Sequence, residues 1–94
     1  MNYIRVHWVH QDPRQPICLL SELDCKRWET RKIEIFSDGS KGYVSKTEDI
    51  GGTVLGDQPV PTLGEIAADP QFIPEVITVS EFEAEWSARR VRTD

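Results

Sequence analysis

The sequence has no long apolar run and very little cysteine. No stretch approaches the roughly 20 apolar residues of a transmembrane helix. The opening segment MNYIRVHW lacks the basic, apolar and small-residue regions of a signal peptide. We therefore expect a cytoplasmic protein with no membrane association. Cys18 and Cys25 are expected to be free thiols, because a cytosolic setting keeps thiols reduced.

Positive charge is missing from nearly half of the chain. Residues 47–88 contain nine Asp or Glu and no Lys or Arg, whereas residues 1–46 and 89–94 each have a net charge of +2. The whole chain has a formal net charge of -5. Such a stretch repels phosphate backbones, so nucleic acid is an unfavourable partner and a basic protein matches the charge better. Alternatively, the acids only keep the domain soluble.

The length limits the chain to a single domain with one core. With 94 residues, of which 38% are hydrophobic, the apolar side chains suffice for one core and leave little for a deep pocket. We expect one domain over residues 1–94 and no large substrate cavity.

The first half predicts a four-stranded antiparallel meander within residues 1–47. The expected strands are 3–9, 17–23, 27–36 and 42–47. In the third, the aromatic and isoleucine residues fall on opposite parities, which a bulge near Thr30 to Lys32 would reconcile. Asp38-Gly39 predicts a hairpin turn before the fourth strand.

The second half predicts an irregular connection over 48–61 and a helical part over 62–94. Thr62 and Glu65 fit a capping box at the start of one short helix. Ser80 to Glu83 repeats the signature for a second helix. The fold class is therefore α+β, with two short C-terminal helices packed on the sheet.

No metal or cofactor site is predicted. His7, His10, Cys18 and Cys25 could in principle bind zinc, but their spacings do not match the close pairs of structural zinc sites. The glycine-rich segment 51–56 lacks the Lys-Ser/Thr of a phosphate-binding loop, and its neighbours are acidic, so it is interpreted as a turn.

No catalytic residue is predicted either. His10 and Asp12 can be combined with Ser21 or Cys18 into a nucleophile arrangement, but many chains allow such a combination. Glu22 with Glu29 is a weak candidate for paired carboxylates. An enzyme is therefore the third hypothesis, after two kinds of binding protein.

The segment 21–32 is the main candidate for a binding site. It surrounds Trp28 with acids and bases, a composition typical of an interface hot spot in which Trp28 is the anchor and Arg27 or Arg31 its partner. Alternatively, Trp28 belongs to the core and the charges pair across strands. Together with the acids of the second half, the predicted contact residues are Glu22, Asp24, Arg27, Trp28, Glu29, Arg31, Glu48, Asp49, Asp57, Glu81, Glu83 and Glu85.

A further set of motifs is spread over nearly the whole length, among them Tyr3 to Val6, Arg27 to Glu29, Gly51 to Thr53, Phe82 and Trp86. In these motifs the chain resembles a family of small bacterial proteins known as a domain of unknown function. The resemblance implies a self-contained bacterial domain and no particular activity. Small acidic domains of this kind are often immunity proteins encoded beside a toxin, which is an analogy.

Two binding functions follow. The first is an immunity protein that neutralises a basic bacterial toxin, with a nuclease as one class, by occluding its active site. The second is an accessory or regulatory module that binds a peptide or nucleic acid through a basic sheet face carrying Arg5, Arg27, Arg31 and Lys32.

Overall fold

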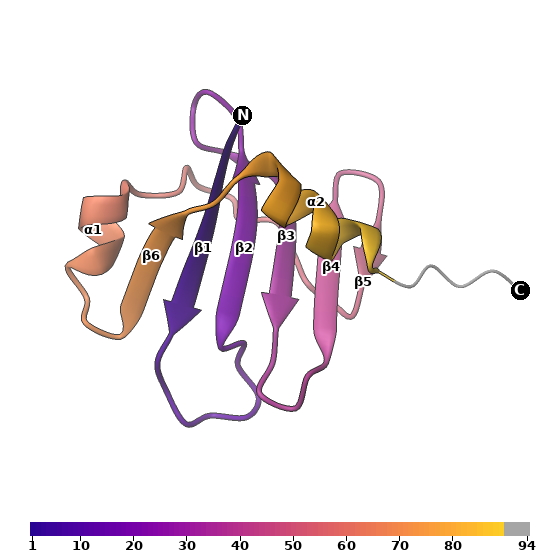
Figure 1. Ribbon diagram of the computed structural model, residues 1–94, viewed down its shortest axis with the longest axis horizontal. Helices are drawn as coiled ribbons and strands as arrows, with labels where there is room; N and C mark the ends of the chain where they lie inside the picture. The colour runs from indigo at the N-terminus through magenta and orange to yellow at the C-terminus, as the bar shows by residue number, and fades with distance from the viewer. Residues whose placement is uncertain (90–94) are drawn as a thin grey trace, which may run out of the picture.

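A computed structural model describes residues 1–89 as one antiparallel sheet of six strands with two short helices (Figure 1). The strand order is β5-β4-β3-β2-β1-β6. In chain order the elements are β1 (Asn2–Trp8), β2 (Cys18–Leu23), β3 (Glu29–Ile35), β4 (Lys41–Ser45), β5 (Asp49–Ile50), α1 (Leu63–Ala67), β6 (Phe72–Val76) and α2 (Val79–Ser87). No helix in residues 1–89 has the length and hydrophobicity needed to span a bilayer.

The α+β class and the antiparallel order of the first four strands are confirmed, but a sheet limited to four strands is wrong. β5 pairs with β4 inside the predicted irregular connection, and β6 pairs with β1 inside the predicted helical part. β6 was missed because Pro74 and Glu75 interrupt the apolar residues of this segment. The N–H of Val9 donates to the carbonyl of Gln71, and the N–H of Ile77 donates to the carbonyl of Tyr3, so odd-numbered residues make the hydrogen bonds between β1 and β6. Pro74 is even-numbered and lies in an edge strand, so its lack of an N–H removes no hydrogen bond from the sheet.

The predicted bulge and hairpin turn are confirmed. Glu22 is paired with Arg31 and Leu23 with Glu29, so Thr30 is the additional residue in β3. Gly39 has a φ of 87° in the β3–β4 turn, a conformation that glycine adopts without steric cost.

Each helix begins with a capping box, although only the first one begins where predicted. Thr62 caps α1 and accepts from the Glu65 N–H, as expected. The cap of α2 is Thr78, whose side chain accepts from the Glu81 N–H, so the prediction of Ser80 was wrong. Both residues are followed at the third position by a glutamate, but Glu83 pairs with an arginine of the sheet instead.

The sheet is covered on both sides by different parts of the chain. α2 crosses one side, called here the helix face, where Phe82 and Trp86 pack on Leu20 and Ile33 (Figure 1). The opposite side, the strap face, is covered by α1 and by the connection 51–61, called here the strap. The residues packed there are Ile4, Val6, Leu23, Val60, Leu63, Ile66 and Phe72. This second, smaller cluster contains the groove described below.

Candidate partner-binding groove

A groove of about 330 Å³ lies on the strap face between the sheet and α1. Ile4 and Val6 of β1 and Leu19 of β2 line it from the sheet, while Val60 and Ile66 line it from the strap and α1. This volume is at the small end of the roughly 300–1,000 Å³ that ligand pockets occupy. The groove therefore suits amino-acid side chains better than a large cofactor.

A buried carboxylate belongs to the lining of this groove. The Glu29 side chain is 8% exposed, and its Oε1 lies 3.2 Å from the Lys32 ammonium. Oε1 also accepts from the Gly56 N–H at 2.8 Å, and Oε2 accepts from the Ser21 hydroxyl at 2.9 Å. Glu29 thus joins the strap to the sheet, and Ser21 beside it also lines the groove.

Two exposed carboxylates, Glu65 and Asp69, contribute to the groove lining from the side of α1. Oε1 of Glu65 completes the capping box with Thr62, and Oδ1 of Asp69 accepts from the Gln71 N–H at 3.0 Å. Within residues 1–89, neither carboxylate has a Lys or Arg at ion-pair distance. The groove therefore combines apolar surface with negative charge that these residues leave unneutralised.

Arg27 holds the strap wall of the groove. Its Nε donates to the carbonyl of Val60 at 2.8 Å, and its Nη2 donates to the carbonyl of Pro61 at 2.7 Å. The Val60 N–H donates back to the Arg27 carbonyl at 2.8 Å. Arg27 has a φ of 67°, an uncommon conformation for a residue other than glycine, and the neighbouring loop fixes it. Arg27 is therefore a positioning residue for the groove.

Trp28 follows directly and is 40% exposed, so the alternative that places it in the core is wrong. Oδ1 of Asp24 accepts from the N–H groups of Lys26 and Trp28 at 2.9 and 3.0 Å, which shapes the loop that presents this side chain. Because the same loop holds Val60, Trp28 and the groove belong to one region of the molecule.

Glu22 and Arg31 form an internal ion pair on the helix face. Arg31 donates to both carboxylate oxygens of Glu22, at 2.9 and 2.6 Å, and also to Glu83 of α2. Its guanidinium lies 4.9 Å from the Phe82 ring centroid and 5.0 Å from that of Trp86. Hydrogen bonds from Arg31 lower the pKa of Glu22 to about 2, despite the opposing effect of burial. Glu22 is 7% exposed, a position that does not suit direct contact with a partner.

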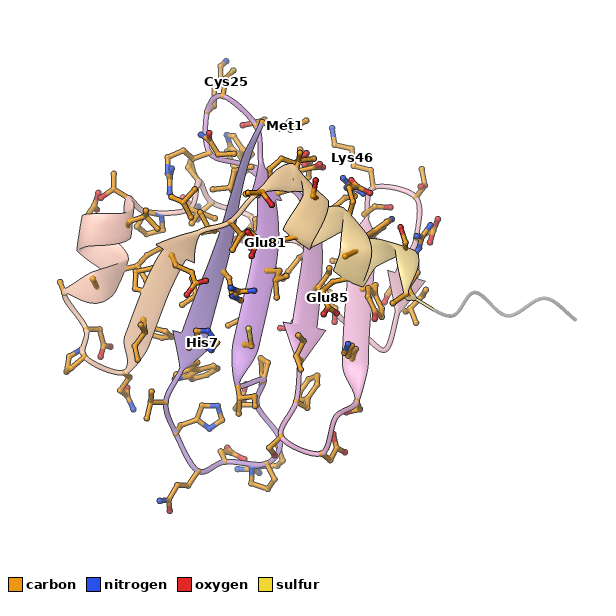
Figure 2. All side chains as sticks on the ribbon, in the orientation of Figure 1. Met1, His7, Cys25, Lys46, Glu81 and Glu85 are labelled. Atoms are coloured by element: carbon orange, nitrogen blue, oxygen red, sulfur yellow. The ribbon has the colours of Figure 1, made fainter. Side chains whose placement is uncertain are left out.

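The α2 acids that were predicted as partner contacts bind the helix to the sheet. Glu83 pairs with Arg31, Glu85 lies 2.9 Å from the Lys41 ammonium, and Glu81 lies 3.7 Å from the Arg5 guanidinium. Figure 2 shows Glu81 and Glu85 extending from α2 over the strands. These three predicted contact residues are therefore already paired with basic residues of the sheet.

The twelve predicted contact residues do not share one surface. Glu22, Arg31 and the α2 acids lie on the helix face, Glu29 lies on the strap face, and the Trp28 loop connects the two at the end of the sheet. Of the others, Glu48 pairs with Arg89 at 3.0 Å. Asp49 on β5 and Asp57 on the strap are exposed.

The basic sheet face is likewise not formed. Arg5 and Arg31 lie on the helix face next to acids, whereas Lys32 lies on the strap face against Glu29. Arg27 lies in a loop and is bonded to backbone carbonyls.

The candidate catalytic and metal residues are also separated. Glu22 bonds to helix-face residues and Glu29 to Ser21 on the strap face, so the two carboxylates point to opposite sides of the sheet. His7 is the register partner of Cys18, but Cys25 lies at the other end of the molecule (Figure 2). Within residues 1–89, no three His, Cys, Asp or Glu side chains form a group that could hold a metal ion.

Of the residues that line the groove, sequence reasoning predicted only Glu29 as a contact residue. Leu19, Ile66 and the carboxylates Glu65 and Asp69 were not among the predicted site residues. The available signal was the spacing of Glu65 and Asp69, four residues apart beside Ile66, which predicts acids and an apolar side chain in one neighbourhood.

No curated protein and no solved structure matches this chain. A family does match, over residues 2–91, and it is described as Domain of unknown function (DUF6881). The match covers nearly the whole sequence, in agreement with the resemblance noted from its motifs. The chain belongs to this family of domains of unknown function.

Proposed function

We propose that this is a non-catalytic protein-binding domain whose partner is a basic protein. In its most specific form, the proposal is an immunity protein that neutralises a basic toxin by occlusion. The observation that carries it is the groove, where an apolar lining adjoins the carboxylates of Glu65 and Asp69. These two have no ion-pair partner within residues 1–89, unlike the acids of α2.

Charge supports a basic partner in two ways. The net charge of -5 attracts a basic protein from a distance and speeds the encounter. The carboxylates beside the groove then favour a cation at close range, whereas they oppose a phosphate. A nuclease is a suitable class of toxin, because a surface that binds phosphates is itself basic.

Trp28 supports a protein partner in particular. It is a large side chain left 40% exposed, in the loop that also holds the groove wall. Tryptophan is enriched among interface hot spots, where it contributes contact area at little cost in conformational entropy. The alternative, a module binding through a basic sheet face, has less support because its four cations are divided among three places and already bonded.

The test is affinity capture from the native host with the tagged domain, at low and at high salt, followed by a growth assay. We expect a basic protein that is recovered at low salt and reduced at high salt, because surface charge attraction is screened. Expressing that protein alone should arrest growth, and co-expression of the domain should restore it. Recovery of only nucleic acid, or of an acidic protein indifferent to salt, would overturn the proposal. A basic partner without toxicity would overturn the immunity role alone.

A further inference from the structure

The groove points to a specific kind of occupant. We propose that it takes a leucine-sized apolar side chain from the partner, and that a neighbouring Lys or Arg of the same segment pairs with Glu65 and Asp69. The inference rests on the proposed function, because it assumes that the groove is a contact surface. It adds the chemistry of the segment that binds.

The apolar half of the inference rests on the lining. Branched aliphatic side chains, Ile4, Val6 and Leu19, come from the sheet, and Ile66 lies opposite them on α1. A volume of about 330 Å³ accepts an aliphatic side chain with some of its backbone. Burying such a side chain removes apolar surface from water on both partners, which favours binding.

The cationic half rests on the unused oxygen atoms of two carboxylates. The hydrogen bonds that Glu65 and Asp69 make within residues 1–89 engage Oε1 and Oδ1, so Oε2 and Oδ2 can accept from a ligand. A guanidinium or an ammonium supplies donors and the complementary charge. Within residues 1–89, the groove lining contains no Lys or Arg, and its carboxylates oppose a phosphate or an acidic peptide.

The occupant is therefore a mixed apolar and basic segment of protein. A purely apolar segment would leave the two carboxylates partly desolvated without a partner, which costs free energy. A purely basic segment would leave the aliphatic lining exposed to water. A leucine or isoleucine adjacent to an arginine or lysine satisfies both parts of the site.

The probes are three capped tetrapeptides with glycine at both ends and leucine–arginine, glycine–arginine or leucine–glutamate in the middle. Each is titrated into the isotope-labelled domain and followed by amide chemical shifts. We expect the leucine–arginine peptide to bind most tightly and to shift amides of the groove residues, Leu19 and Ile66 among them. The other two should bind at least about threefold more weakly, since each loses one set of contacts.

Two matched double variants separate local pairing from overall charge. Glu65→Gln with Asp69→Asn removes both groove charges but keeps an oxygen for each existing hydrogen bond, since glutamine also completes a capping box. Asp38→Asn with Asp49→Asn makes the same change in net charge away from the groove. Asp38 lies in the β3–β4 turn, and Asp49 lies on β5, the edge strand opposite β6. The groove variant should weaken the leucine–arginine peptide about threefold or more, and the control variant by less than half of that effect.

Several results would overturn the inference. In the titrations, these are amide shifts confined to the helix face, or no saturable amide shift with any peptide. In the comparisons, these are equal loss of affinity for the leucine–arginine peptide in the two double variants, or a glutamate peptide that binds as tightly as the leucine–arginine peptide. Self-association of the domain that buries the groove would also overturn it, and analytical ultracentrifugation of the free domain reports that. The peptide titration needs no native partner, so it tests the groove separately from the proposed function. It can fail although a basic toxin is captured through another surface, and it can succeed although no toxin is captured.

Discussion

Replacing Glu22 by glutamine should remove a pH-dependent part of the stability of this domain. Glu22 is buried on the helix face, where it accepts hydrogen bonds from Arg31, Thr30 and Tyr3. These bonds need a carboxylate that carries its charge, and those from Arg31 lower its pKa most. Glutamine has a similar shape but no proton to gain or lose, so the variant isolates the effect of ionisation.

The magnitude follows from the pKa. The folded state lowers the pKa of Glu22 from its ordinary 4.5 to about 2. At about 1.4 kcal/mol per unit, ionisation of this group stabilises the fold by about 3 kcal/mol at neutral pH. Because the folded pKa is depressed, the contribution is complete above the unfolded pKa of 4.5 and is lost as the pH falls toward about 2. At pH 3 about 1.4 kcal/mol of it remains.

The assay is urea unfolding of the parent and of Glu22→Gln between about pH 7 and pH 3, followed by tryptophan fluorescence. The difference in unfolding free energy between the two proteins should shrink by about 2 kcal/mol over that range. Other carboxylates titrate in both proteins and cancel in the difference. Gln11→Ala, at an exposed position with no titratable group, is the control and should show no such change. A difference that stays constant from pH 7 to pH 3 would refute the reasoning.

Three further predictions concern the core, the groove wall and the docking of α2. Trp86→Ala should lower the unfolding free energy by about 3–5 kcal/mol because Trp86 is buried, whereas Trp28→Ala should cost about 1 kcal/mol or less; urea unfolding compares them. Arg27→Asn tolerates the left-handed backbone but loses the bonds to the strap, so amide shifts around Val60 should change and stability should fall by about 1–2 kcal/mol. Glu83→Lys places a cation beside the guanidinium that Glu83 now neutralises, so hydrogen exchange in α2 should become faster.

The features predicted correctly are those encoded over a few residues. The alternation in β1, the glycine of the β3–β4 turn and the Thr62 capping box are all local patterns. The bulge was predictable because Thr30 shifts the parity of the side chains within one strand. Such signals depend on backbone geometry and on neighbours close in sequence, so a single sequence contains them.

The features that were missed depend on partners distant in sequence. The segment that contains Pro74 can form strand β6 because it lies at the edge of the sheet, where it pairs only with β1, a strand from the other end of the sequence. The same proline in a central strand would have prevented pairing. Thr78 and Ser80 are each followed at the third position by a glutamate, so the local capping pattern does not decide which of them begins α2.

The uneven distribution of charge along the sequence partly reflects ion pairs within the domain, between the sheet and α2. The sheet supplies Arg5, Arg31 and Lys41 on one face, and α2 supplies an acid opposite each of them. Acids of the acidic stretch therefore form ion pairs with basic residues of the first half. A count of charges along the chain cannot distinguish such paired acids from acids that bind a partner. The distinction appears only after pairing is assigned: Glu65 and Asp69 beside the groove have no Lys or Arg at ion-pair distance within residues 1–89, whereas the acids of α2 do. For this reason the proposal of a basic partner depends on Glu65 and Asp69 beside the groove and not on the acids of α2.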